Sequence, residues 1–121
     1  MHADLLALEQ ADRELGFQRP SEAITLAINL EPCMMCLGAA ITLGVSRVFY
    51  ALESPNDGAV ALLDAWHAPV EPSFFQRPAE IQGGILRAES QALFAEYASG
   101  SGPAGMRAWA RGLASNQVGT V

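Results

Sequence analysis

The sequence has no lysine, and its seven arginines are scattered single positions set against thirteen acidic residues, for a net charge of −6. Affinity for a polyanion comes largely from cations that displace counterions from phosphates. The charge balance therefore does not favour long nucleic acid as a partner. A local basic patch, or a groove assembled by two copies of the chain, would still be compatible with this composition.

Long apolar runs are also missing, since no stretch approaches the ~18 uninterrupted apolar residues that a membrane span needs. The N-terminus lacks a basic segment followed by an apolar one, so it does not resemble a secretory signal, and we expect the cytosol as the compartment. The 121 residues show no internal repeat and fit a single domain with its own core. We expect the tail, residues 115–121, to fray.

Cysteine is scarce, and the only two, Cys33 and Cys36, lie three positions apart. In a reducing compartment such a pair is more often a metal site or a redox pair than a structural disulfide. Taken alone, the spacing leaves three interpretations open: metal binding, redox chemistry, and two buried cysteines without a chemical role.

The first half of the chain alternates helical and extended patterns. Apolar residues at three-to-four spacing predict a helix over Ala3–Leu15, and alternating β-branched and apolar residues predict a strand over Ile24–Leu30. Pro32 suits the first turn of a helix over Cys33–Leu43, and Arg47–Leu52 is a second strand. Two strands joined by a helix form a parallel βαβ crossover, so the predicted class is α/β.

The second half is less regular. We expect one helical piece around Ala59–Trp66 and a loop over His67–Pro78, where three prolines occur. A helix is predicted over Leu86–Ala98, followed by a weakly amphipathic segment over Met106–Leu113.

The two cysteines could bind one metal ion together, because positions i and i+3 in a helix project from the same side. The helix N-terminus favours thiolate over thiol, and hence metal binding. His2 opens the first predicted helix, and its imidazole would make a third ligand. Three protein ligands leave the fourth tetrahedral position of zinc open for water, which is typical of catalytic rather than structural sites.

The histidine motif and the cysteine motif together point to a protein family more specifically than the cysteine pair alone. His2 starts a helix with an acid two residues on, and Pro32-Cys33-x-x-Cys36 follows a strand, close to the His-x-Glu and Pro-Cys-x-x-Cys signature of zinc deaminases. The chain resembles the cytidine and deoxycytidylate deaminase superfamily, in the branch of nucleoside, guanine and tRNA adenosine deaminases. The segments that carry the resemblance are His2–Leu8, Leu30–Ala40, Arg47–Ala51, Ser54–Ala59 and Gly84–Phe94.

This resemblance implies a three-layer α/β/α fold around a mixed sheet, and one Zn²⁺ held by His2, Cys33 and Cys36. The implied reaction is hydrolytic deamination, because zinc lowers the pKa of water from about 16 towards ~7 and the hydroxide attacks the amino-bearing ring carbon. A homodimer is the expected assembly.

Asp4 departs from the family pattern, in which a glutamate at this position shuttles the proton as general base and then general acid. Aspartate is shorter by one carbon–carbon bond, about 1.5 Å. A misplacement of about 1 Å can cost ~10²-fold in rate. We therefore expect Asp4 to be a weak or a disabled shuttle.

The N-terminal region is a second departure. Members of the family usually have a helix and two strands before the histidine, whereas Met1 alone precedes His2 here. We expect this first helix and both strands to be missing from the fold. The strand Ile24–Leu30 would then expose a hydrogen-bonding edge, which favours self-association.

Three functions follow. The negative net charge favours an enzyme that acts on a free nucleobase or nucleoside. The sequence does not identify its substrate-binding residues. The alternative is a tRNA adenosine-to-inosine deaminase. In that case Arg107 and Arg111, one helical turn apart, could present two positive charges to a phosphate of the tRNA. The third is a catalytically silent zinc-binding fragment, supported by Asp4 and the N-terminal departure.

Overall fold

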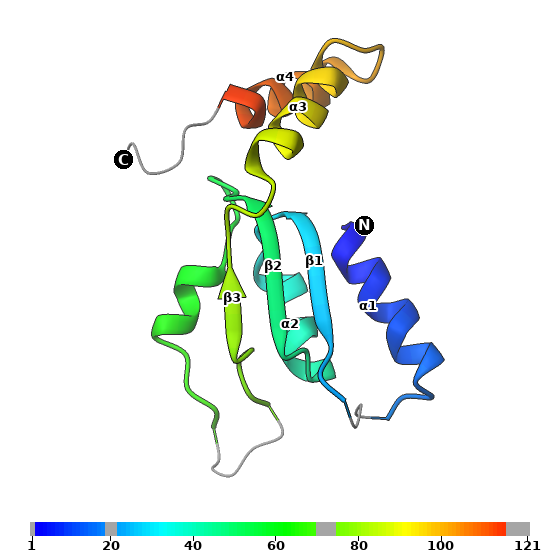
Figure 1. Cartoon of the computed structure of the whole chain (residues 1–121), viewed down its shortest axis with the longest axis vertical. Coiled ribbons are helices and arrows are strands. Elements are labelled where there is room, and N and C mark those ends of the chain that lie inside the picture. The colour runs from blue at the N-terminus through cyan, green and yellow to red at the C-terminus, as the bar shows by residue number, and fades with distance from the viewer. Residues whose placement is uncertain (1, 19–21, 70–74, 116–121) are drawn as a thin grey trace.

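The computed structural model describes residues 2–18, 22–69 and 75–115 (Figure 1). Its elements follow in the order α1 (Ala3–Glu14), β1 (Thr25–Leu30), α2 (Met34–Leu43), β2 (Arg47–Leu52), a 3₁₀ helix (Val60–Asp64), β3 (Glu80–Gln82), α3 (Arg87–Ala98) and α4 (Ala104–Ser115). The predicted α/β class is confirmed, and the predicted helices and strands of the first half agree with the structure to within a residue at each end.

The three described strands form one parallel sheet in the order β1-β2-β3. Leu26 pairs with Val48 across β1 and β2, and Val48 pairs with Ile81 across β2 and β3. The predicted βαβ crossover is therefore present, with α2 as the connecting helix. Within the described residues the sheet is wholly parallel, so the antiparallel part of the expected mixed sheet does not occur among them.

The core lies between the sheet and the first two helices. Leu8 of α1 and Ala40 of α2 pack with Leu26 and Val48 of the sheet in one buried cluster. Alternate residues of a strand face opposite sides, and this is why Leu26 is buried while its neighbours Thr25 and Ala27 are exposed. Figure 1 shows α2 behind the sheet and α1 alongside β1.

The second half differs more from the sequence prediction. The helical piece around Ala59–Trp66 is a short 3₁₀ helix over Val60–Asp64, and the last helix, α4, is longer than the predicted Met106–Leu113. The strand β3 was not predicted. Its three residues do alternate, with Ile81 half-buried between the exposed Glu80 and Gln82, but so short an alternation does not define a strand, which its pairing with β2 does.

The carboxyl ends of the strands point towards one end of the molecule, where the start of α1 and the α3–α4 hairpin also lie (Figure 1). In open parallel sheets, ligands bind outside the carboxyl ends of the strands. Among the described residues no strand pairs with the outer edge of β1. None of the helices in the described ranges is long and apolar enough to cross a bilayer.

Candidate metal centre

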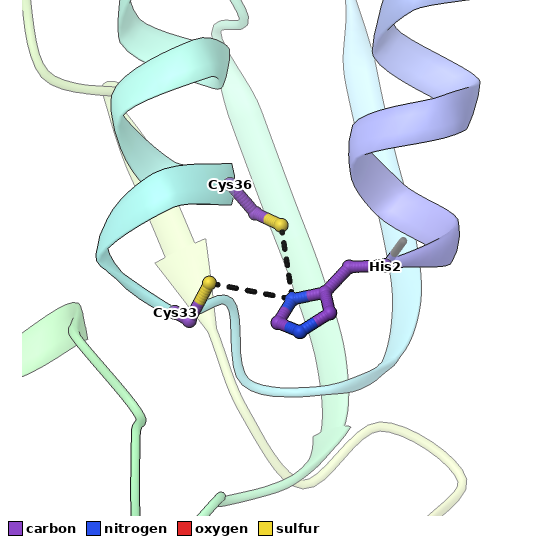
Figure 2. Close-up of side chains that lie close together, drawn as sticks. All are labelled: His2, Cys33 and Cys36. Carbon is purple, nitrogen blue, oxygen red and sulfur yellow. Dashed lines mark hydrogen bonds between the residues drawn. The ribbon is translucent and has the colours of Figure 1, made fainter.

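His2 precedes the first turn of α1 in an extended conformation, with φ −71° and ψ 143°. Its carbonyl accepts the backbone hydrogen bond from Leu6, so the helix itself fixes the position of the His2 Cα, from which the side chain extends. This local geometry directs the imidazole away from the helix and towards the start of α2 (Figure 2).

Cys33 and Cys36 approach the same point from the other helix. Cys33 is the extended N-cap residue of α2, and Cys36 lies in its first turn with no exposed surface. Pro32, which has no amide proton to satisfy, is buried just before them. The structure therefore brings together His2, Cys33 and Cys36, which are 31 to 34 positions apart in the chain.

The ring nitrogen of His2 lies between the two sulfurs. Its Nδ1 is 3.4 Å from Sγ of Cys33 and 3.5 Å from Sγ of Cys36, as Figure 2 shows with dashed lines. A neutral imidazole nitrogen either donates one proton or offers one lone pair, so it makes one good hydrogen bond rather than two. One nitrogen at nearly equal distances from two sulfurs is the arrangement expected of three ligands that share one metal ion.

The distances fit zinc. With Zn–S bonds of about 2.3 Å and Zn–N bonds of about 2.0–2.1 Å, tetrahedral geometry separates nitrogen and sulfur ligands by about 3.6 Å. The two observed separations, 3.4 Å and 3.5 Å, are close to this value, and all three ligand atoms lie within 4.8 Å of one another. Two soft thiolates and one imidazole are a donor set that suits zinc.

The thiol of Cys36 corrects one expectation from the sequence. We expected the helix N-terminus to favour its thiolate, but burial raises the pKa of the Cys36 thiol above its ordinary value, and the adjacent Asp4 carboxylate and Cys33 thiol raise it further. Without a bound cation, burial and the acidic neighbours therefore favour the protonated thiol. A coordinating divalent cation reverses such a shift, because a metal-bound thiol loses its proton.

Asp4, the expected proton shuttle, lies in the first turn of α1 beside this cluster. Its side chain lies close enough to the Cys36 thiol to raise the pKa of that thiol, and it also borders the adjacent cavity. One carboxylate oxygen, Oδ1, accepts the amide proton of Leu5 at 3.1 Å. The carboxylate is therefore held next to the donor set, at the position where the family pattern has glutamate.

Glu31 anchors the loop that faces the cysteines. Its Oε1 accepts the amide proton of Ser54 at 3.2 Å, and its Oε2 accepts that of Val60 at 3.0 Å. Between these two residues, Gly58 forms an isolated antiparallel bridge with Cys33. Glu31 thus ties both ends of the loop to the segment that carries the first cysteine, which supports a structural role.

A cavity of about 580 Å³ opens beside the donor set. His2, Asp4 and Cys33 border it on one side, and the exposed edge of β1 forms another wall. Phe94 of α3 and Trp109 of α4 also line it. These two rings meet edge to face, with their centroids 5.7 Å apart and their planes at 89°.

Sequence reasoning did not identify these aromatic lining residues. Phe94 and Trp109 are distant from the metal motifs in the sequence, and only the folding of the hairpin brings them to the cavity. Arg107 and Arg111 do not line it. The guanidinium of Arg107 donates from Nε to the carbonyl of Gly102 at 2.9 Å, so part of its hydrogen-bonding capacity is used within the hairpin.

The chain is similar to curated proteins of tRNA metabolism. It is 36% identical over 100 residues to a tRNA(Ile)-lysidine synthase of Deinococcus radiodurans, covering 78% of this chain and 16% of that protein. It is 30% identical over 96 residues to a tRNA-specific adenosine deaminase of Bacillus subtilis, covering 79% of this chain and 57% of the relative. The chain therefore spans little more than half the length of that deaminase.

Solved structures share the fold. A structure from a study of A-to-I editing by tRNA:A34 deaminases superposes with a TM-score of 0.56 at 23% identity, covering 76% of this chain and 64% of that one. A variant of NE0047 in complex with 8-azaguanine superposes with a TM-score of 0.55 at 29% identity, covering 79% and 56%. The cytidine-deaminase-like fold expected from the sequence is thereby confirmed.

The match to a family covers the whole candidate metal centre. Residues 1–89, which contain His2, Asp4 and both cysteines, match the MafB19-like deaminases. The resemblance noted in the sequence is thus confirmed, and the chain belongs to the MafB19-like deaminase family.

Proposed function

We propose that this protein is a zinc-dependent hydrolytic deaminase of a free nucleobase or nucleoside, with His2, Cys33 and Cys36 as the zinc ligands. The observation that carries the proposal is the placement of one imidazole nitrogen at 3.4 Å and 3.5 Å from two sulfurs, at the wall of a cavity. Three protein ligands leave one tetrahedral position open, as in catalytic zinc sites.

The overall reaction replaces an exocyclic amino group by a carbonyl oxygen and releases ammonia. Zinc, when bound, supplies a water whose pKa is lowered enough for it to act as a nucleophile near neutral pH. Asp4 is the residue that moves protons: its carboxylate takes one from the attacking water and returns one to the departing amino nitrogen. Its place beside the Cys36 thiol and at the cavity supports this role.

The lining of the cavity favours a small substrate without phosphate. Three of its residues are acids, Asp4, Glu31 and Asp57, and the described residues that form its walls include no arginine. A phosphate placed there would be repelled by these carboxylates and would meet no arginine among the described lining residues, which disfavours a nucleotide or an RNA backbone at this point. Phe94 and Trp109 instead offer apolar surface on which a neutral base can stack.

A second candidate is a deaminase of adenosine in tRNA, because the chain is 30% identical to a tRNA-specific adenosine deaminase over 79% of its length. In this case the phosphates would have to lie outside the acidic cavity. The two candidates differ in salt dependence: turnover of tRNA should fall steeply with salt, whereas turnover of a neutral base should not.

The test is ammonia release from a panel of guanine, cytosine, adenine, their nucleosides and unmodified tRNA. The purified protein is assayed at two salt concentrations beside Cys36→Ala, which removes a proposed ligand, and Gly112→Ala, an exposed helix position that does not line the cavity. We expect salt-independent release from at least one base or nucleoside, lost in Cys36→Ala and kept in Gly112→Ala.

Other results would contradict the proposal in distinct ways. Release from tRNA alone would favour the second candidate. Stoichiometric zinc without release from any substrate would identify a catalytically silent zinc-binding protein, which the shortened acid at position 4 also fits.

A further inference from the structure

The α3–α4 hairpin is attached to the rest of the protein mainly through one of its two helices. The helices α3 and α4 pack extensively against each other, and α3 also contacts β2. Figure 1 shows both helices beyond the carboxyl ends of the strands. The position of the cavity residues Phe94 and Trp109 therefore depends on how the first turns of α3 are held.

Two polar contacts hold these first turns. The guanidinium of Arg87 donates to Glu53 in a bidentate pair, with Nη1 2.7 Å from Oε2 and Nη2 3.1 Å from Oε1. One turn later, the Asn29 amide of β1 donates to the hydroxyl of the buried Ser90 at 3.2 Å. Since positions three and four apart share a helix face, Arg87, Ser90 and Phe94 lie on the same side of α3.

The linker before α3 does not fix the hairpin by regular structure. Gly84 and Leu86 both have positive φ, of 80° and 52°, and for leucine this is an uncommon backbone conformation. The amide of Ile85 donates to the carbonyl of Tyr50 at 3.1 Å, which ties the linker to β2. Beyond this point the direction of α3 depends on side-chain contacts.

We propose that Glu53 and Arg87 are a positioning pair, which sets the orientation of the α3–α4 hairpin and so places Phe94 and Trp109 over the substrate. This inference rests on the proposed function for its substrate, but not for its structural part. A guanidinium fork paired with a carboxylate fixes an angle as well as a distance, because both hydrogen bonds must be made at once.

The pair is suited to positioning rather than to general stability. Both side chains are about one-third exposed, at 32% and 31%, and partly exposed ion pairs contribute little to the folding equilibrium. Arg87 holds the pKa of Glu53 below its ordinary value, so the carboxylate is ionised around neutral pH and the pair is formed there. Breaking it should loosen the hairpin without unfolding the domain.

The experiment uses Arg87→Gln and Arg87→Lys, with Arg13→Gln as the matched control, because Arg13 makes an exposed ion pair with Glu9 on α1. Loss of uniform binding raises KM and leaves kcat unchanged. We expect the KM of the base that serves as substrate to rise roughly tenfold in Arg87→Gln, with kcat within about twofold of the value for the unaltered protein. Arg87→Lys keeps the charge but not the fork, so its KM should be intermediate.

A second measurement does not depend on activity. In a Trp66→Phe background the only tryptophan is Trp109. We expect Arg87→Gln, but not Arg13→Gln, to change the emission maximum of Trp109 and its quenching by acrylamide. The charge-reversed double variant Glu53→Arg with Arg87→Glu should restore the emission of the unaltered protein at least in part, which a purely local loss of Arg87 would not do.

The outcomes separate this inference from the proposed function. Unchanged Trp109 emission in Arg87→Gln would overturn the positioning pair, whatever the activity. An unchanged KM in an active Arg87→Gln variant would overturn its link to substrate binding. A changed emission in a protein that deaminates none of the tested bases would support the positioning pair and refute the proposed function.

Discussion

The carboxylate of Glu31 occupies the space in which a side chain on Gly58 would begin. A Cβ atom built on Gly58 would lie 2.2 Å from Oε1 of Glu31, well inside van der Waals contact. The loop from Ser54 to Val60 can close over Glu31 only because position 58 has no side chain. In this way a residue outside the proposed metal ligands helps to hold the loop that bridges to Cys33.

Gly58→Ala should therefore destabilise the protein. Glu31 would have to turn away and give up its hydrogen bonds to the amides of Ser54 and Val60. Loss of hydrogen bonds to a charged group costs about 1.5–3 kcal/mol. We expect a loss of this size in the free energy of unfolding, measured by urea denaturation.

A double-mutant cycle checks the cause. In a Glu31→Ala background the clash is gone, so Gly58→Ala should then cost much less than in the unaltered protein. Equal costs in the two backgrounds would show that Glu31 is not the reason for glycine at this position.

The length of the acid at position 4 leads to a second prediction. Asp4→Glu extends the carboxylate by about 1.5 Å towards the reacting atoms. Since a misplacement near 1 Å can cost ~10²-fold, kcat should rise by up to that factor. Steady-state kinetics on whichever base is deaminated measures the change.

The isosteric variant Asp4→Asn is the control, because it keeps the size of the side chain and removes its ability to take a proton. Its kcat should fall below that of the unaltered protein. Equal kcat values for aspartate, glutamate and asparagine at this position would exclude a proton-transfer role for it.

The outer edge of β1 leads to a third prediction. Among the described residues it has no strand partner, and unpaired edges template self-association unless charge or proline blocks them. Thr25, exposed at the start of β1, offers a place for such a charge. Thr25→Lys should shift sedimentation velocity profiles towards smaller species at high protein concentration.

Thr42→Lys is the matched control, since it adds the same charge to an exposed position of α2. It should leave the profiles unchanged. If Thr42→Lys disperses the protein and Thr25→Lys does not, association uses the α2 surface and the edge of β1 is not involved.

Local patterns were sufficient to predict the first half of the fold. The apolar periodicity of α1, the alternation in β1 and the glycine that ends α2 each have a local physical cause. Gly44, for example, adopts the left-handed conformation, φ 79°, in which a helix commonly ends. The approach of His2 to the cysteines was implied by a family resemblance and not by spacing.

The parts that local patterns did not predict depend on tertiary contacts. The strand β3 has only three residues, too few for their alternation to predict a strand, and it is defined by its pairing with β2. The raised pKa of the Cys36 thiol comes from burial and from Asp4, which is 32 positions away. Phe94 and Trp109 reach the cavity only through the packing of the hairpin, so no short window of sequence contains that information.

The proposed chemistry requires that His2, Cys33 and Cys36 bind one zinc ion and leave a fourth coordination position open. Metal analysis of the protein purified without added metal, combined with X-ray absorption at the zinc edge, tests it most directly. We predict one zinc per chain with two sulfur ligands at about 2.3 Å and lighter ligands at about 2.0–2.1 Å, and loss of the metal in Cys36→Ala. Protein without stoichiometric zinc, or zinc retained in Cys36→Ala with an unchanged spectrum, would contradict this prediction.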